Sequence, residues 1–297
     1  MIVVRLMGGL GNQMFQYAFG LYLANTNNTK LKLDLTLLED RNSKNANVVY
    51  RDFELSCFKL SGQIASQKEI HQFNPLPTKN IFKKIRNKLY YFYHKNIIIQ
   101  NKHDWNSSNL KIKNNTCIVG RWQSELYFKN IEDAIRKEFI FKNELNEYSK
   151  DIANQIQRNN KSISIHLRRI DYVNNKLYAE KIGALKINYY NKAIKKICEL
   201  IERPRFFIFS DDIEFAKKNL PKNINAFFIK QKSNVKAEQD LHLISLCKNH
   251  IISNSTFSWW GAWLSNNLQK IVIAPKNWAK DVDYKPNKII PNNWIKI

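Results

Sequence analysis

The second half of the chain alternates short runs of β-branched and aromatic residues with longer amphipathic segments. The runs predict strands at 162–167, 206–209, 226–229, 250–253 and 271–274. Between them, apolar residues recur at helical spacing and predict helices. Strands that are apolar throughout and separated by helices are typical of parallel sheets covered on both faces. This pattern restricts the second half to an α/β fold.

The first half begins in the same way, with predicted strands at 2–6, 31–35 and 117–120. Residues 44–115 differ, because they are rich in Asn, include Pro75 and Pro77, and show few clear strands. We expect helical and loop insertions there. A break falls at 154–161, after a polar predicted helix. The sequence therefore predicts two Rossmann-like domains, 1–155 and 156–297, whose parallel sheets face each other across a ligand-binding cleft.

Composition limits the class of protein. The 297 residues are 44% hydrophobic and 12% aromatic, as in a globular protein that buries a full-sized core. No apolar run approaches the ~20 residues that cross a bilayer. The segment 1–6 has no basic stretch or cleavage site of a secretion signal, so we expect a cytoplasmic protein. The four cysteines are scattered without C-x-x-C spacing, so we expect buried free thiols and no metal site.

The formal net charge of +23 implies an anionic partner. Basic residues are densest in Lys79–Lys95, where they interleave with apolar and aromatic residues near one helical face. This segment is either an amphipathic helix on an anionic membrane or a solvated Lys-rich helix, and the sequence leaves both interpretations open.

The first strand ends in G-G-L-G-N-Q, where Gly9 and Gly11 allow a sharp turn before a helix. Asn12 and Gln13 place two amide side chains beside that turn. A dinucleotide-binding loop would need a third glycine where this chain has Met14, which makes an NAD-dependent enzyme a weak alternative. In that alternative, the acid Asp34 at the end of the next strand would bind a ribose.

The strand at 162–167 runs into H-L-R-R-I-D-Y. His166 and Arg168 share one face of the strand, and Arg169 follows at its end. Paired arginines offer planar, bidentate donors that suit a diphosphate. An ordinary surface ion pair with Asp171 is the competing interpretation.

The next strand ends in Ser210, Asp211 and Asp212, directly before a predicted helix. Ser210 or Asp211 would be a good helix N-cap, and that role explains one of the two acids. The second carboxylate is then available to accept the N1–H and N2–H₂ donors of a guanine base.

The strand at 250–253 runs into S-N-S-T-F-S-W-W-G-A-W-L. Short polar side chains and free helix N–H groups converge there, which is a favourable place for a phosphate. Ordinary capping of a helix with a tryptophan-rich core is the alternative. The candidate ligand-binding residues of this segment are Asn254, Ser255, Thr256, Phe257 and Ser258.

Together these four segments resemble the α-1,2-fucosyltransferases of glycosyltransferase family 11. A weaker similarity covers Gly120–Glu125, with the sequence G-R-W-Q-S-E. The chain departs from the family pattern at Ile170, where the family usually has glycine. Residues 44–115 carry no resemblance.

The resemblance implies a GT-B fold and an inverting enzyme that moves L-fucose from GDP-β-L-fucose to the 2-hydroxyl of a galactose. It implies that Arg168 and Arg169 bind the diphosphate, with Ser255, Thr256 and Ser258 assisting. One of Asp211 and Asp212 would hold guanine, while His166 positions the nucleotide. Gly9, Gly11, Asn12 and Gln13 would approach the donor from the first domain. No metal or other cofactor is expected.

Inversion by direct displacement normally needs a general base, for which Glu125 and Asp171 are the candidates. The expected acceptor is a galactose-terminated glycan, such as a lipid-linked O-antigen or other surface polysaccharide at the inner face of the plasma membrane. A glycosyltransferase with another nucleotide sugar is the nearest alternative. A basic nucleic-acid-binding protein would also explain the charge, but no nucleic-acid-binding motif is present, so no nucleic acid is expected.

Overall fold

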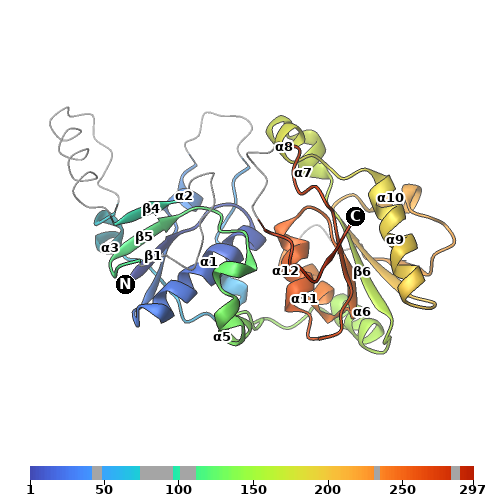
Figure 1. Ribbon diagram of the computed structural model, residues 1–297, viewed down its shortest axis with the longest axis horizontal. Helices are drawn as coiled ribbons and strands as arrows, with labels where there is room; N and C mark the ends of the chain where they lie inside the picture. Colours follow the sequence, from blue (N-terminus) through green and yellow to red (C-terminus); the bar gives the residue numbers. More distant parts are fainter. Residues whose placement is uncertain (42–48, 74–95, 101–111, 231–234, 282–287) are drawn as a thin grey trace. The chain divides into compact units, whose positions relative to one another are not determined.

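The computed structural model describes residues 1–41, 49–73, 96–100, 112–230, 235–281 and 288–297. The chain forms two compact units, unit 1 from Met1 to Ile140 and unit 2 from Phe141 to Ile297. Figure 1 shows the elements of each unit, which we describe separately. The basic segment Lys79–Lys95, with its predicted amphipathic helix, lies outside the described residues.

Unit 1 is built on a five-stranded sheet with the order β3-β2-β1-β5-β4, in which every pairing is parallel. Its strands are β1 (Ile2–Arg5), β2 (Leu31–Asp34), β3 (Gln63–Ile64), β4 (Ile97–Ile99) and β5 (Thr116–Val119). Its helices are α1 (Leu10–Thr26), α2 (Thr36–Glu39), α3 (Gln67–His71) and α5 (Glu132–Glu138), with short 3₁₀ turns η1 (Leu55–Cys57), η3 (Glu125–Tyr127) and η4 (Lys129–Ile131). The region without clear strands thus supplies both sheet edges, β3 and β4.

Unit 2 contains a six-stranded sheet with the order β11-β10-β9-β6-β7-β8, again parallel throughout. Its strands are β6 (Ser162–Leu167), β7 (Arg205–Ser210), β8 (Ala226–Phe228), β9 (Asn249–Ile251), β10 (Val272–Ala274) and β11 (Ile295–Lys296). Its helices are α6 (Glu147–Gln157), α7 (Ile170–Asn174), α8 (Lys176–Lys181), α9 (Ile187–Leu200), α10 (Ile213–Asn219), α11 (Ala237–Leu246) and α12 (Thr256–Leu264).

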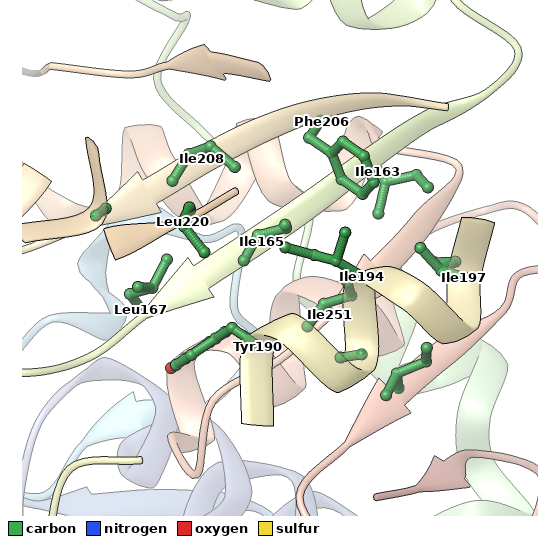
Figure 2. Packing of buried hydrophobic residues seen from close by; sticks show 13 residues of the cluster. Ile163, Ile165, Leu167, Tyr190, Ile194, Ile197, Phe206, Ile208, Leu220 and Ile251 are labelled. Atoms are coloured by element: carbon green, nitrogen blue, oxygen red, sulfur yellow. The ribbon is translucent and has the colours of Figure 1, made fainter. Parts of the chain in front are cut away.

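Two apolar clusters cover the two faces of this sheet. On one face, α9 packs its Ile194 against Ile163 and Ile165 of β6, as Figure 2 shows. The alternate residues of β7, Phe207 and Phe209, belong to the second cluster with residues of α6 and α11. Successive side chains of a strand point to opposite faces of the sheet, and both faces are covered here. This explains why residues 206–209 of β7 are apolar at every position. The predicted α/β class with two parallel sheets of the GT-B type is confirmed.

The unit boundary lies at 140/141, whereas the sequence places it at 155/156. The difference is α6, whose Ile152 and Ile156 are buried in the same cluster as Phe207 of β7. The helix therefore belongs to unit 2, although its polar outer face and the loop after it resemble a linker. One cysteine also departs from expectation, because Cys198 is exposed while Cys57, Cys117 and Cys247 are buried. Within the described residues, no helix is both long and apolar enough to cross a membrane.

Candidate active site

The charged segments of unit 2 meet because β6 and β7 are neighbours in the sheet. Leu167 at the end of β6 is paired in register with Ser210 at the end of β7. The carboxyl ends of parallel strands lie at the same edge, so the residues that follow both strands lie close together. Arginines follow β6 and aspartates follow β7, which brings opposite charges together at one sheet edge.

Arg168 is enclosed by two carboxylates. Its Nη2 pairs with Asp171 Oδ2, and its Nη1 lies 3.2 Å from Asp211 Oδ2. Burial opposes the charge of Arg168, but Asp211 and Asp171 outweigh that effect and raise the pKa of its guanidinium. Arg168 therefore keeps its charge in a site that is largely shielded from water.

Asp211 also anchors the start of α7. Its Oδ1 accepts the backbone N–H of Arg169 at 2.9 Å, and its Oδ2 accepts that of Ile170 at 3.2 Å. Burial raises the pKa of Asp211, against the lowering by Arg168 and the two N–H groups. Both oxygens of Asp211 thus have partners in this structure, and Ile170 begins a helix where the family pattern has glycine.

Arg169 and Asp212 form the second charge pair. Arg169 Nε lies 3.4 Å from Asp212 Oδ2, and about a third of each side chain is exposed. The other oxygen of Asp212 caps α10, while its backbone N–H donates to Ser210 Oγ at 3.0 Å. The N-cap of α10 is therefore Asp212, whereas the sequence predicted Ser210 or Asp211, because the helix begins only at Ile213.

His166 is buried under α12. Its Nδ1 lies 3.0 Å from Ser253 Oγ, and its ring lies 5.4 Å from that of Phe257. Burial, reinforced by the positive charge of Arg168, lowers the pKa of His166 to about 3. The imidazole is consequently neutral near pH 7 and cannot supply a positive charge to a phosphate.

Some of the polar groups at the start of α12 form hydrogen bonds with one another. Ser258 is fully buried, and its hydroxyl donates to the Ser255 carbonyl at 3.1 Å and lies 3.3 Å from Ser253 Oγ. Ser255 is the N-cap residue, and its side chain makes no capping hydrogen bond. Thr256 and Phe257 are half-buried in the first turn of α12. In this arrangement Ser258 supports the turn from inside.

Asn254 holds two loops. Its Nδ2 donates to the carbonyls of Gly183 at 3.0 Å and Trp278 at 3.1 Å, while its buried Oδ1 has no hydrogen-bond partner among the residues that the structure describes. Its own carbonyl accepts from the Tyr172 hydroxyl at 3.2 Å. The side chain of Asn254 therefore connects the α12 turn to the segments around Gly183 and Trp278.

In unit 1, the turn before α1 is held by Gln13. This side chain is fully buried, and its Nε2 donates to the carbonyls of Gly8 and Asp52 at 2.7 and 2.8 Å. The carboxylate of Glu54 accepts the N–H of Leu10, at the first turn of the helix, at 3.0 Å. The negative charge of Glu54 would repel an anion that approaches this end of the helix. Glu54 is far from Leu10 in the sequence, so no local motif indicates this contact.

Asn12 lies beside that turn and accepts a hydrogen bond from Gln123 Nε2 at 2.6 Å. An added Cβ at Gly8, whose φ is +74°, would lie 2.6 Å from Asn12 Nδ2, so the side chain of Asn12 covers the turn. Gly9 is the N-cap residue of α1, and Gly11 is the second residue of that helix. The half-buried Glu125 begins η3. The structure therefore brings Asn12 and the 120–125 segment together within unit 1.

Asp34 cannot serve the dinucleotide-binding alternative. It is fully buried, its Oδ2 lies 2.7 Å from Arg5 Nε, and its Oδ1 accepts the N–H and hydroxyl of Thr36. Both oxygens are thus engaged with the protein. Among the described residues, no three His, Cys, Asp or Glu side chains are grouped so that they could hold a metal ion.

The fold is shared with a solved glycosyltransferase. The crystal structure of fucosyltransferase NodZ from Bradyrhizobium shares the fold, with a TM-score of 0.51 and 15% identity over 88% of this chain and 92% of that chain. The family model described as Glycosyl transferase family 11 matches residues 1–297. The chain therefore belongs to glycosyltransferase family 11, as the four motifs predicted.

Two bacterial relatives match nearly the whole of this chain. Alpha-1,2-colitosyltransferase of Escherichia coli is 33% identical over 305 residues, covering 100% of this chain and 98% of that protein. O-antigen biosynthesis glycosyltransferase WbnK of Escherichia coli is 29% identical, covering 98% of this chain and 99% of that protein. Galactoside alpha-(1,2)-fucosyltransferase 1 of Homo sapiens is 22% identical over 66% of this chain and 56% of that protein.

Proposed function

We propose that the protein transfers L-fucose from GDP-β-L-fucose to the 2-hydroxyl of a terminal galactose, with inversion to an α-1,2 linkage. Relatives named for alpha-1,2 transfer, from a bacterium and from man, support the linkage. The relative named for O-antigen biosynthesis supports a surface polysaccharide as the acceptor. A lipid-linked form of that acceptor would place the enzyme at an anionic membrane face, which the charge of +23 would favour.

The arginine pair after β6 carries this proposal. Breaking the bond between the sugar C1 and the phosphate oxygen leaves negative charge on the departing GDP. Fixed cationic donors that face this charge lower the barrier because they need no reorganisation during the reaction. Arg168 and Arg169 are such donors, since Asp171 and Asp211 hold Arg168. Asp212 holds Arg169. The start of α12 would add backbone N–H groups.

The acceptor hydroxyl must lose a proton as its oxygen bonds to C1. Asp171 is ion-paired with Arg168 in this structure and would have to leave it to accept that proton. Glu125 at the start of η3 is the other candidate. We expect Arg168→Ala to cost about 100-fold or more in kcat, as loss of a charge-stabilising donor does, and far more than Glu125→Gln.

The direct test is a transfer assay with GDP-fucose and a β-galactoside, followed by NMR assignment of the product linkage. The proposal predicts fucose on the galactose 2-hydroxyl, formed in EDTA as well as without it. Transfer to another hydroxyl would contradict the linkage. Dependence on a divalent metal would contradict the assignment of charge stabilisation to the arginines.

Colitose is a second candidate sugar, because the relative with 33% identity is named for it. Colitose is L-fucose without the 3-hydroxyl, so the same diphosphate site would serve either donor. Parallel assays with the GDP derivatives of fucose and colitose decide between them through the ratio of their kcat/KM values.

A further inference from the structure

Arg169 leaves the end of β6 and lies against the first turn of α10. The centre of its guanidinium is 3.8 Å from the centroid of the Phe215 ring. This distance is well within the range in which a cation is attracted to the face of an aromatic ring. Phe215 is half-buried, so this contact is partly shielded from water.

Asp212 fixes the same guanidinium from a second direction. Its Oδ2 lies 3.4 Å from Arg169 Nε, and its Oδ1 accepts the backbone N–H of Phe215 at 3.1 Å. The N-cap hydrogen bond thus ties the carboxylate and the aromatic ring to one helical turn. Any movement of Arg169 away from this turn must break the ion pair and the ring contact together.

The two contacts leave one edge of Arg169 open. They use its Nε and the face of the guanidinium, while Nη1 and Nη2 make no hydrogen bond or ion pair with any described residue. Arg168 differs, because both of its terminal nitrogens are paired with carboxylates. The open edge of Arg169 carries four N–H groups in one plane, the arrangement that binds two phosphate oxygens.

We propose that Asp212 and Phe215 are positioning residues, which hold Arg169 so that its Nη1–Nη2 edge faces the diphosphate of the donor. This inference rests on the proposed function. A free arginine side chain has many rotamers, and binding a phosphate would immobilise it at an entropic cost. The α10 turn has already restricted the side chain before the nucleotide arrives. Asp212 then serves both Arg169 and the start of α10.

The test compares the affinities of GDP and guanosine, measured by calorimetry, in the wild type and in two variants of Phe215. Phe215→Leu keeps an apolar side chain but removes the aromatic face, and we expect GDP affinity to fall about tenfold, the size of one partly shielded cation–π contact. Phe215→Tyr keeps the ring face and should retain the wild-type affinity. Guanosine has no phosphate, so its affinity should be unchanged in every variant.

Three outcomes would overturn the inference. Unchanged GDP affinity in Phe215→Leu would show that the ring does not position Arg169. An equal loss of guanosine affinity would show that Phe215 only supports the fold. An equal loss in Phe228→Leu, the same change at a half-buried phenylalanine of β8, would show that the effect is not local. Absence of GDP binding in the wild type would instead refute the proposed function itself.

Discussion

The two buried histidines of unit 2 make its stability depend on pH. Burial lowers the pKa of His250 to about 3, as it does for His166, and Lys270 contributes at His250. In the unfolded chain both titrate near pH 6.5. Below that pH the unfolded state binds protons that the folded state does not, so acid favours unfolding.

We therefore predict that the free energy of unfolding is at its full value above pH 6.5 and falls as the pH is lowered toward 3. Each histidine contributes a slope of about 1.4 kcal/mol per pH unit well below pH 6.5. Urea unfolding at a series of pH values, followed by tryptophan fluorescence, measures this free energy of unfolding. The signal reports on unit 2, because five of the seven tryptophans lie there.

His250→Gln provides the control. It removes one titrating group outside the arginine cluster, at a position where Nδ1 lies 2.8 Å from Ser164 Oγ. The slope between pH 6 and pH 4 should decrease by about 1.4 kcal/mol per pH unit, the contribution of one proton. Equal slopes in the variant and the wild type would show that His250 is not held neutral by the fold.

At the scale of elements, the position of α12 depends on a close contact with α11. An added Cβ at Gly261 would lie 2.4 Å from Cγ2 of the buried Ile244. Gly261→Ala should gain about 1 kcal/mol of helix propensity but lose about 1–3 kcal/mol by overpacking, so we expect a net loss of stability. The measurement is the free energy of unfolding in urea.

A double variant tests the cause of that loss. Ile244→Leu removes Cγ2 at nearly constant volume, so adding it to Gly261→Ala should cost less than the sum of the two single changes. Strictly additive losses would contradict the steric account. The start of α12 is also the proposed phosphate-binding segment. The variants should therefore rank in the same order by GDP affinity as by free energy of unfolding.

The sequence predicted the long elements and the strand ends well. The strand predicted at 162–167 coincides with β6, and α10 begins directly after Asp212, where a helix was predicted. It missed β3, β4 and β11, which have two or three residues each and lie at the edges of the sheets, where residues are only partly buried or exposed. The sequence analysis also did not predict the short helices α7 and α8.

The candidate site was predicted as a set of positions, without the pairs among them. Strand order brings the residues after β6 and β7 together, and a parallel sheet makes that order foreseeable. Which carboxylate pairs with which arginine depends on three-dimensional geometry that the sequence does not contain. The hydrogen bond from the Leu10 N–H to the Glu54 carboxylate, at the first turn of α1, likewise could not be predicted from the sequence. Asn254 and Ser258 remain predicted ligand-binding residues, and their side chains also hold the surrounding backbone.

At the scale of the whole molecule, two parallel-sheet units carry different parts of the proposed reaction. Unit 2 holds the arginine–aspartate cluster, and unit 1 holds the turn with Asn12 and the segment with Glu125. A net charge of +23 attracts every polyanion, so binding to heparin or to nucleic acid would not distinguish a specific site. A defined nucleotide distinguishes it, because guanine recognition does not follow from charge.

Calorimetric titration with GDP, UDP, ADP and NAD in EDTA buffer tests the central claim most directly. We predict that GDP alone binds tightly, without a metal, and that Arg169→Ala abolishes this binding while the protein remains folded. Tight binding of NAD, equal binding of all four nucleotides, or unchanged GDP binding in Arg169→Ala would contradict a guanosine diphosphate site at the ends of β6 and β7.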